Sequence, residues 1–513
     1  MVHTTRDGAI GHAWVYFAVL VGAYLIYRLR NYIRIVIFVW GLRGPPAVPL
    51  LGNANVFYDK DVLHKMSHEM HRDYGRVLRV WMTCFPYVIL HEPDDIQIVL
   101  GNPKHTEKIY LYRLLDNFIG KGLITREART WKRHRRVLQP AFHRNVLEGF
   151  TESFGRSAAR LANKFLDSHG KDVNITSFVN DTVYDILNET VLGLTREGRE
   201  KQRIDDADLP FRKGQVFMPY RLMRPWLLID WVYRMTDVGK SEEKQRENLF
   251  RACKRMMAIK REVMRSGDDS ERPRVSLVGR ETSLLEYMVE INEKDPNFTD
   301  EDIIDECCTF MLAGQESVST ATALTMFLLA GNQDWQEKCV QELEKIFGPD
   351  SRAPSMRDLT EMRCLEMCIK ETLRLYPSVP LFARTLGEDV KIEDHVIPAG
   401  CGVIIMPYCT HRLPHHYDDP HAFDPGRFDG ANSERRHPYA YLPFSAGPRN
   451  CIGYKFALLE MKAMISAVLR TWQLEPVPGK KEVQPKFRLT LRATGGLWVK
   501  MKKRTATQNI HPV

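Results

Sequence analysis

The segment from Thr299 to Gly331 predicts one long helix, and this helix limits what the chain can fold into. Thr299 is followed by three acidic residues, and acidic side chains in a first turn stabilise the positive end of a helix. About thirty residues at 1.5 Å each give a helix of roughly 45 Å, enough to cross a whole globular body. Helical patterns also dominate from about residue 130 to residue 380, so we expect a mostly helical body.

Short extended segments accompany these helices. β-branched and aromatic runs predict strands at residues 76–82, 87–91, 388–406 and 486–500. The first two form a hairpin, with its turn expected at Phe85-Pro86. Residues 266–282 are polar and charged and are expected to form a loop. The predicted fold class is mainly α with small β-sheets (α+β).

An uncharged N-terminal segment, residues 9–27, is long enough to cross a bilayer as a helix. Arg28, Arg30 and Arg34 follow it in place of a small-residue cleavage site. By the positive-inside rule these arginines stay in the cytoplasm. We therefore expect an N-terminal transmembrane helix and a cytosolic body, with a buried core helix as the alternative.

The chain then divides into four expected regions. A second apolar stretch at residues 35–40 is expected in the membrane interface, and the Pro-rich GPPAVPLLG is expected to be a stiff connector. The regions are a membrane anchor with its interfacial segment (1–43), a hinge (44–52), one large domain (53–499) and a basic C-terminal tail (500–513).

The charge distribution argues against nucleic acid as a partner. The chain of 513 residues has a net charge of +9. Residues 1–43 hold five Arg and one Asp, and residues 500–504 hold three Lys and one Arg, so the body between them is close to neutral. A nucleic-acid binder normally carries its excess charge on a face of the folded body. A hydrophobic share of 44% and a charged share of 27% also exclude a mainly disordered or fibrous chain.

Ten cysteines are scattered along the chain without a CxxC pair, which gives no support to thioredoxin-like or zinc-ribbon folds. By default each is expected to be a small buried hydrophobe. They are Cys84, Cys253, Cys307, Cys308, Cys339, Cys364, Cys368, Cys401, Cys409 and Cys451.

Cys451 differs from the others because of its surroundings in FSAGPRNCIG, residues 444–453. Gly447 and Gly453 flank it and allow a tight turn and the close approach of the backbone to a flat ligand. Backbone N–H groups can stabilise a thiolate there, with Phe444 as an apolar shield.

The pattern FxxGxRxCxG resembles the haem-binding loop of the cytochrome P-450 monooxygenases, and the resemblance extends over essentially the whole chain. It implies non-covalently bound haem b, with Cys451 as the thiolate ligand of the iron and with Phe444, Gly447, Arg449 and Gly453 around it. A thiolate ligand favours O–O cleavage. A merely buried Cys451 is the alternative.

Two further motifs match that family. In KETLR, Glu371 and Arg374 are three residues apart on one helical face and can pair. The family locks such a pair to a later arginine, here Arg427 in FDPGRF, in a structural triad that supports the haem loop. The family usually has Glu before this arginine, where the present chain has Gly426; we expect no loss of function from that departure.

In WKRHR, Trp131 and Arg135 are four residues apart on a helix and can reach one partner. The resemblance assigns them to a haem propionate, together with Arg384 and Arg449, because arginine grips a carboxylate with two parallel hydrogen bonds. The remaining basic residues of the run are expected on a solvated face that would also receive an acidic reductase; they are Lys132, Arg133 and Arg136.

The long helix carries AGQES at residues 313–317, which resembles the family's oxygen-activation motif. Gly314 would let the helix open beside the iron, while Glu316 and Ser317 would relay protons to dioxygen. Ser317 replaces the usual threonine and is less restricted in its rotamers, so looser coupling is expected. Ala313 stands where many related fatty-acid hydroxylases carry a haem-esterifying Glu.

HRLPHH (411–416) and ETLRLYPSVPLFAR (371–384) resemble the animal microsomal type, in particular the clan that includes the family-four fatty-acid hydroxylases. The substrate pocket is expected to include Ala313, Val379 and Phe382. Other lining is expected from the 100–122 loop, the 205–235 region and residues near 489–493. The apolar segment 217–231 is expected either to dip into the bilayer or to be a core helix.

The function implied is insertion of one oxygen atom of O2 into a lipophilic substrate (fatty-acid-like, isoprenoid, sterol or foreign compound). Electrons would come from NADPH through a separate NADPH-cytochrome P-450 reductase, with cytochrome b5 as a further partner, at the endoplasmic reticulum membrane. Three alternatives stay open. They are a lipid-hydroperoxide isomerase or dehydratase without reductase, a haem sensor or carrier without turnover, and a haem-free membrane glycoprotein with sequons at Asn174, Asn180, Asn188 and Asn297.

Overall fold

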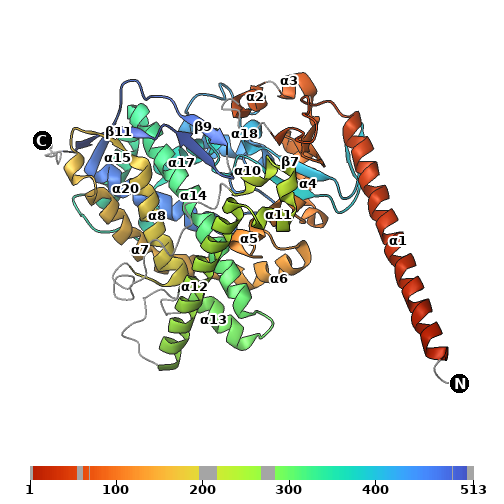
Figure 1. The fold of residues 1–513 in the computed structure, drawn as a ribbon. Coiled ribbons are helices and arrows are strands. Elements are labelled where there is room, and N and C mark those ends of the chain that lie inside the picture. Colours follow the sequence, from red (N-terminus) through yellow and green to blue (C-terminus); the bar gives the residue numbers. More distant parts are fainter. Residues whose placement is uncertain are drawn as a thin grey trace, which may run out of the picture.

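The computed structural model describes residues 4–54, 62–68, 70–195, 217–266, 283–487 and 489–504. Within these residues the fold is mainly helical with four small sheets (Figure 1), as the sequence predicts. The predicted loop at 266–282 lies almost wholly outside the described residues.

The helices, with short 3-10 turns labelled η, have the following bounds: α1 (Thr4–Gly41), α2 (Val62–His68), α3 (Met70–Tyr74), α4 (Pro93–Gly101), η2 (Pro103–His105), η3 (Tyr110–Leu115), α5 (Asp116–Ile119), α6 (Ala128–Leu138), η4 (Gln139–Phe142), α7 (Arg144–Asn163), η5 (Leu166–Ser168), α8 (Ile175–Leu192), α10 (Phe217–Leu222), η8 (Pro225–Leu228), α11 (Asp230–Arg234), α12 (Asp237–Ser266), α13 (Leu284–Lys294), α14 (Asp300–Gly331), α15 (Gln333–Phe347), α16 (Met356–Glu361), α17 (Arg363–Leu375), α18 (Pro407–Thr410), η10 (Pro425–Phe428), α19 (Gly430–Arg435), η11 (Pro438–Ala440) and α20 (Tyr454–Thr471).

The strands form sheets of four, three, two and two. The largest has the order β1 (Val77–Met82), β2 (Phe85–Leu90), β7 (Gly402–Ile405) and β4 (Phe382–Thr385). The three-stranded sheet has the order β3 (Asp172–Asn174), β11 (Trp498–Lys503) and β8 (Trp472–Pro476). The pairs are β5 (Val390–Ile392) with β6 (His395–Ile397), and β9 (Gln484–Phe487) with β10 (Leu491–Thr494).

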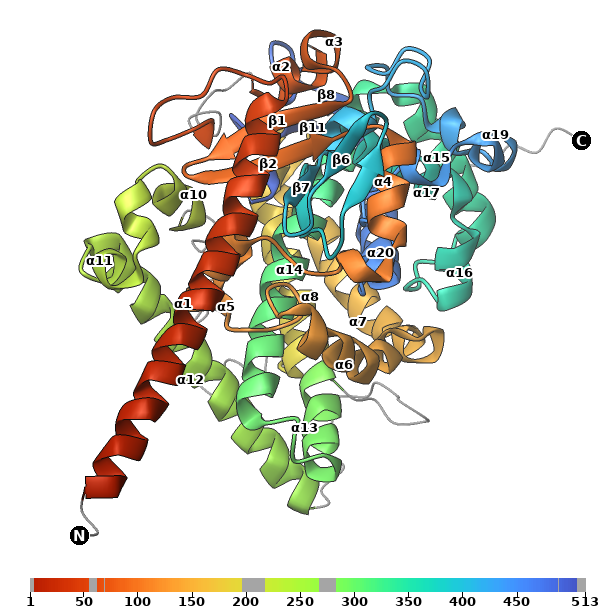
Figure 2. The same ribbon diagram turned by 90° about the vertical axis from the view of Figure 1, so that its right-hand side faces the viewer.

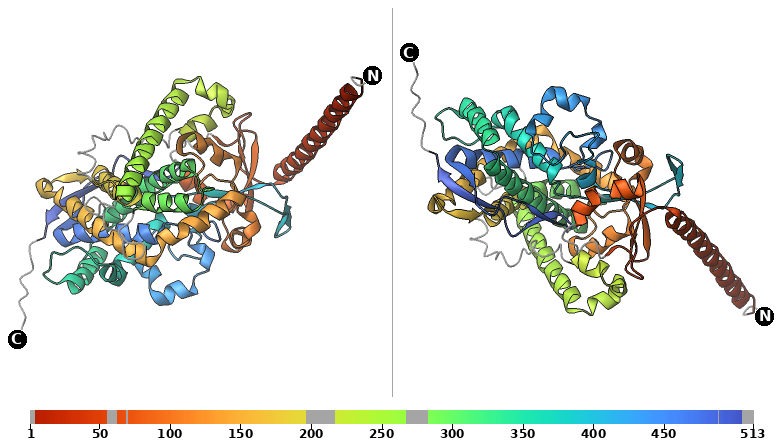
Figure 3. Two further views of the ribbon diagram at one scale, coloured as in Figure 1. Left: turned by 90° about the horizontal axis from the view of Figure 1, so that it is seen from below. Right: turned by 90° about the horizontal axis from the view of Figure 1, so that it is seen from above.

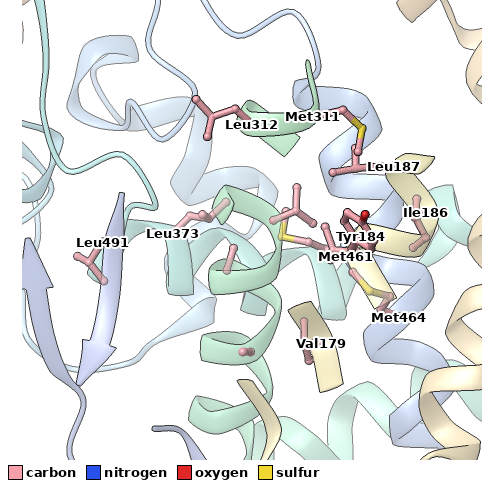
Figure 4. Packing of buried hydrophobic residues seen from close by; sticks show 14 of the residues in the cluster. Val179, Tyr184, Ile186, Leu187, Met311, Leu312, Leu373, Met461, Met464 and Leu491 are labelled. Carbon is pink, nitrogen blue, oxygen red and sulfur yellow. The ribbon is translucent and has the colours of Figure 1, made fainter. Parts of the chain in front are cut away.

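The predicted long helix is confirmed as α14, which runs through the middle of the body (Figures 1 and 2). Thr299 caps it, since its hydroxyl accepts the N–H of Asp302 while the Asp302 carboxylate accepts the N–H of Thr299. α8, α17 and α20 pack against α14. The core between them is filled by interleaved aliphatic and sulfur-containing side chains, such as Leu187 and Met461 (Figure 4).

The first hairpin forms, but its predicted turn is wrong. Met82 pairs with Phe85, and the turn is Thr83-Cys84, with Thr83 at a φ of 57°. Pro86 lies inside β2, opposite Trp81. β2 pairs with β7 only from Tyr87 onward, so Pro86 faces no second strand that would need its missing N–H.

The expected transmembrane span at residues 9–27 is not supported. Among the described residues, no helix is long and apolar enough to cross a membrane.

α1 projects away from the body (Figure 3), and only its C-terminal part is anchored there. Ile35, Val39 and Leu42 are buried against the large sheet and the β5–β6 pair. Ile37 and Trp40, on the other side of the helix, are exposed. The stretch predicted for the membrane interface is therefore half buried in protein.

Two other sequence expectations change. The segment 217–231 is divided among α10, η8 and α11, and Trp226 and Trp231 are mostly exposed, so it is not a core helix. At the C-terminal end, β11 continues to Lys503, so Lys500, Lys502 and Lys503 belong to a sheet rather than to a free basic tail.

Candidate functional site

A cavity of about 420 Å³ lies beside the middle of α14. It is lined mainly by apolar side chains from η3, α8, α14 and the segment before β4. Ala313, Val379 and Phe382, the three residues predicted for a substrate pocket, all line it. Leu489 and Thr490 do so as well, as expected for that region.

The loop of residues 444–453 closes one side of this cavity. Cys451 lines the cavity, and its backbone N–H donates to the carbonyl of Phe444 at 2.9 Å. The loop needs Gly447, which has a φ of +72° and where a Cβ would lie 1.9 Å from the Leu100 carbonyl oxygen. Gly447 itself does not line the cavity, whereas Phe444 and Gly453 do.

The charge state of Cys451 is set by opposing effects. Burial raises the pKa of its thiol, while the Gly453 backbone N–H and the positive charge of Arg135 favour the thiolate and lower it. The net effect is that the pKa of the Cys451 thiol is raised.

The four side chains predicted to hold a propionate lie together at the cavity wall. Trp131, Arg135, Arg384 and Arg449 all line it. The Arg449 guanidinium lies over the Trp131 ring, 5.0 Å from its centroid. Arg384 donates to the Arg449 carbonyl at 3.2 Å. Arg135 donates 2.8 Å bonds to the carbonyl and the side-chain oxygen of Asn450, so it also supports the loop.

These cations are poorly neutralised by the protein. Burial, then the charge of Arg384, lowers the pKa of Arg449 to about 9. Burial and the charges of Arg384 and Arg449 lower the pKa of Lys108, which the sequence reasoning did not single out. The buried Nε of Arg449 has no hydrogen-bond partner. The cluster is therefore suited to an anionic ligand such as a carboxylate.

The predicted oxygen-motif residues separate into two groups. Gly314 and Ser317 line the cavity, whereas Glu316 does not. The Glu316 carboxylate is buried, and it accepts hydrogen bonds from Arg492 of β10, one from Nε at 2.9 Å. The Ser317 hydroxyl donates to the Ala313 carbonyl at 2.6 Å. The sequence offered no signal for Arg492.

Gly314 has a packing role that its motif did not reveal. A Cβ at this position would lie 2.7 Å from Cδ2 of Leu187, so glycine allows α8 to approach α14. α14 is one uninterrupted helix from Asp300 to Gly331.

The predicted structural triad is present behind the cavity. Arg374 donates to both carboxylate oxygens of Glu371, at 2.7 and 2.8 Å, and both side chains are fully buried. Arg374 also donates to the carbonyls of His411, Pro420 and Ala422. Arg427 is a looser third member, 3.5 Å from Glu371.

The sequence matches the family model described as Cytochrome P450 over residues 42–499. The chain belongs to the cytochrome P450 family. Three similar proteins carry family-four names. A probable cytochrome P450 4aa1 of Drosophila melanogaster is 47% identical and covers 93% of this chain and 92% of its own. Cytochrome P450 4c3 of the same species is 35% identical, covering 94% of both chains. Human cytochrome P450 4V2 is 32% identical, covering 90% and 89%.

As a P450 monooxygenase, the protein is an oxidoreductase of a family that holds haem on a cysteine thiolate and uses O2. The described residues fit that group. The cavity brings one cysteine to the same space as a set of under-neutralised cations, and haem b carries both an iron and two carboxylates. Lipophilic substrates and redox partners are general to the family.

Proposed function

We propose that the protein binds haem through Cys451 and inserts one atom of O2 into a lipophilic substrate held in the cavity beside α14. The observation that carries the proposal is that Cys451, the Arg384–Arg449 cluster and Ser317 face one apolar cavity. Bound haem would supply the activation of dioxygen. The protein residues would bind it, orient the substrate and deliver protons.

In this proposal Arg135, Arg384, Arg449 and Trp131 hold the propionates, with Lys108 as a further cation. Ser317 holds a proton near the reacting atoms through its hydroxyl. Glu316 is a positioning residue, because its carboxylate is engaged by Arg492 away from the cavity. Ala313 offers no carboxylate to esterify haem, so the haem stays non-covalent.

The test is the carbon-monoxide difference spectrum of the reduced, detergent-solubilised protein. A strongly red-shifted Soret band is expected for the native chain, and Cys451→Ala should lose it. Cys409→Ala serves as the control, because this cysteine is buried and does not line the cavity. An unchanged spectrum in Cys451→Ala would mean that another residue ligates the iron.

The substrate class we propose is fatty-acid-like or isoprenoid, since the cavity is apolar and the relatives belong to family four. Electrons would come from NADPH through a separate flavoprotein reductase, with cytochrome b5 as an accessory donor. The exposed basic residues of α6 are the proposed docking point. Substrate-dependent NADPH consumption with added reductase tests this directly.

The same experiment separates the other candidates. A hydroperoxide isomerase would convert lipid hydroperoxide without consuming NADPH. A sensor or carrier would neither convert lipid hydroperoxide nor consume NADPH. One of the four sequons of the glycoprotein alternative cannot carry a glycan in the folded chain, because the Asn188 side chain is fully buried and donates to the Tyr184 carbonyl.

We also propose contact with the endoplasmic reticulum membrane from the cytosolic side. α1 exposes a row of large apolar side chains, among them Trp14, Phe17 and Leu20. Trp226 and Trp231, with exposed fractions of 61% and 68%, form a second apolar surface together with Ile229 and Met235. Exposed tryptophans and aliphatic side chains suit the interfacial region of a bilayer.

A further inference from the structure

Three cysteines far from the haem loop meet at the contact between α15 and α17. Cys364 and Cys368 are four residues apart and therefore share one face of α17. Cys339 reaches them from α15. Its Sγ lies 3.6 Å from the Sγ of Cys364 and 3.6 Å from that of Cys368. All three sulfurs lie within 4.8 Å of one another.

We infer that Cys339, Cys364 and Cys368 form a binding site for a soft, thiophilic metal cation, zinc(II) or copper(I). The cation would join α15 to α17.

The spacing suits metal coordination. With bonds of about 2.3 Å, tetrahedral zinc holds its sulfur ligands about 3.8 Å apart, and the two measured separations are 3.6 Å. The three ligand atoms of the cluster are all sulfur. Thiolates select zinc and copper(I) over the hard cations that prefer oxygen.

One position in the cluster suits a thiolate. Cys364 is the second residue of α17, where the helix dipole stabilises negative charge. A cation would then take the place of the protons on the other two thiols.

The solvent access of the cysteine cluster and the number of ligands that it offers also suit a metal ion. Cys339 and Cys368 are buried, whereas Cys364 is partly exposed and leaves one side open to solvent. Solvent can supply a fourth ligand to zinc from that side, and copper(I) is satisfied by three thiolates. The Glu342 carboxylate is engaged elsewhere, because it accepts the backbone N–H groups of Cys364 and Leu365 at 2.7 and 3.1 Å.

A second group, Glu92, His415 and His416, also has its ligand atoms close together. It offers nitrogen and oxygen, and Glu92 and His415 already interact at 3.1 Å. A test must therefore identify the ligand atoms and not only count bound metal.

The experiment uses the full-length, haem-loaded protein, reduced with a phosphine, incubated with zinc(II) and freed of excess metal. Zinc per protein is measured by mass spectrometry, and X-ray absorption at the zinc edge identifies the ligands. We expect one zinc with three sulfur neighbours at about 2.3 Å. A parallel sample with copper(I), examined at the copper edge against a competing chelator, decides between the two cations.

Cys364→Ala should weaken binding at least tenfold and remove the three-sulfur signature. Cys84→Ser, at an exposed cysteine outside the cluster, should bind as the native chain does. The carbon-monoxide spectrum should be unchanged in both variants, which keeps this test independent of the proposed haem ligation. Cys368→Ala is the second variant of the cluster. Its carbon-monoxide spectrum should likewise be unchanged, which shows that the variant is folded.

Three results would overturn the site: a first shell of nitrogen and oxygen only, unchanged zinc content in Cys364→Ala, or no bound zinc or copper(I) in the reduced native protein. Mass spectrometry of the protein as purified also shows whether the three cysteines form disulfide bonds. A Cys339–Cys364 or Cys339–Cys368 disulfide found there in place of metal would mean that the cluster serves thiol redox chemistry.

Discussion

Ser317 and Ser319 offer a matched pair of hydroxyls on α14. Each donates to the carbonyl four residues earlier, at 2.6 Å, but only Ser317 lines the cavity. We predict that Ser317→Ala lowers product formed per NADPH by roughly tenfold or more, since a lost proton-transfer group costs about 10² in rate, and that peroxide release rises correspondingly.

Ser319→Ala is the control for helix geometry and should leave coupling unchanged. The measurement is peroxide and product per NADPH with added reductase. Equal coupling in the native chain and Ser317→Ala would remove Ser317 from the proton path.

Glu242, on α12, is a buried carboxyl whose ionisation should make stability depend on pH. Burial raises its pKa to about 7 from a usual 4.5. The unfolded chain therefore loses this proton at lower pH than the folded chain does, and the native state grows less stable as pH rises from about 4.5 to 7.

We predict that Glu242→Gln removes this loss. At pH 8 the variant should be more stable than the native chain by up to about 3 kcal/mol, from the difference in pKa. At pH 5 the native chain and the variant should have similar free energies of unfolding. Denaturant unfolding at both pH values measures the effect, and a stability gain of equal size at pH 5 would show that the charge of Glu242 is not its cause.

At the scale of elements, Arg374 makes several of the contacts that join α17 to the segment before the haem loop. Arg374 is fully buried, pairs with Glu371 and donates to three carbonyls. Removing one partner of a buried ion pair costs about 3–5 kcal/mol. We predict that Arg374→Met lowers the free energy of unfolding by about 3–5 kcal/mol and that this variant binds haem poorly.

Arg427→Met provides the comparison, because this side chain is 3.5 Å from Glu371 and makes one carbonyl contact, with Asp419. The free energy of unfolding of Arg427→Met should fall by only about 1–2 kcal/mol, and this variant should retain haem. Thermal unfolding and haem content measure both variants. Equal losses would contradict the unequal roles that the contacts assign to the two arginines.

How well each element could be predicted from the sequence depended on whether local signals set it. α14 was predictable because its cap, acidic first turn and length all agree. The hairpin turn was not, because Thr83-Cys84 carries no turn-forming glycine or asparagine, while Pro86 looked like a breaker. Arg492 reaches Glu316 from a strand 176 residues away, and no local pattern encodes such a contact. The cysteine cluster was missed for the same reason, since Cys339 and Cys364 meet only in the folded chain.

At the scale of the whole molecule, α1 divides into a part that projects and a part that belongs to the body. Asn31 donates to the Ala399 carbonyl, Arg34 pairs with Asp389, and Ile35, Val39 and Leu42 are buried. Residues 14–30 are mostly exposed. A chain starting at Leu29 should therefore keep the native haem spectrum and stability, yet bind phospholipid vesicles much more weakly in flotation.

A chain starting at Arg43 should behave differently, because it uncovers the apolar cluster beneath Ile35, Val39 and Leu42. Burial of each such side chain contributes about 1.5–3 kcal/mol, so this truncation should be clearly destabilised or aggregate. Residual vesicle binding by the shorter truncation should be lost on Trp226→Ser with Trp231→Ser, two exposed positions. If removing residues 1–28 leaves flotation unchanged, α1 is not what attaches the protein to lipid, and the surface around Trp226 and Trp231 must do so alone.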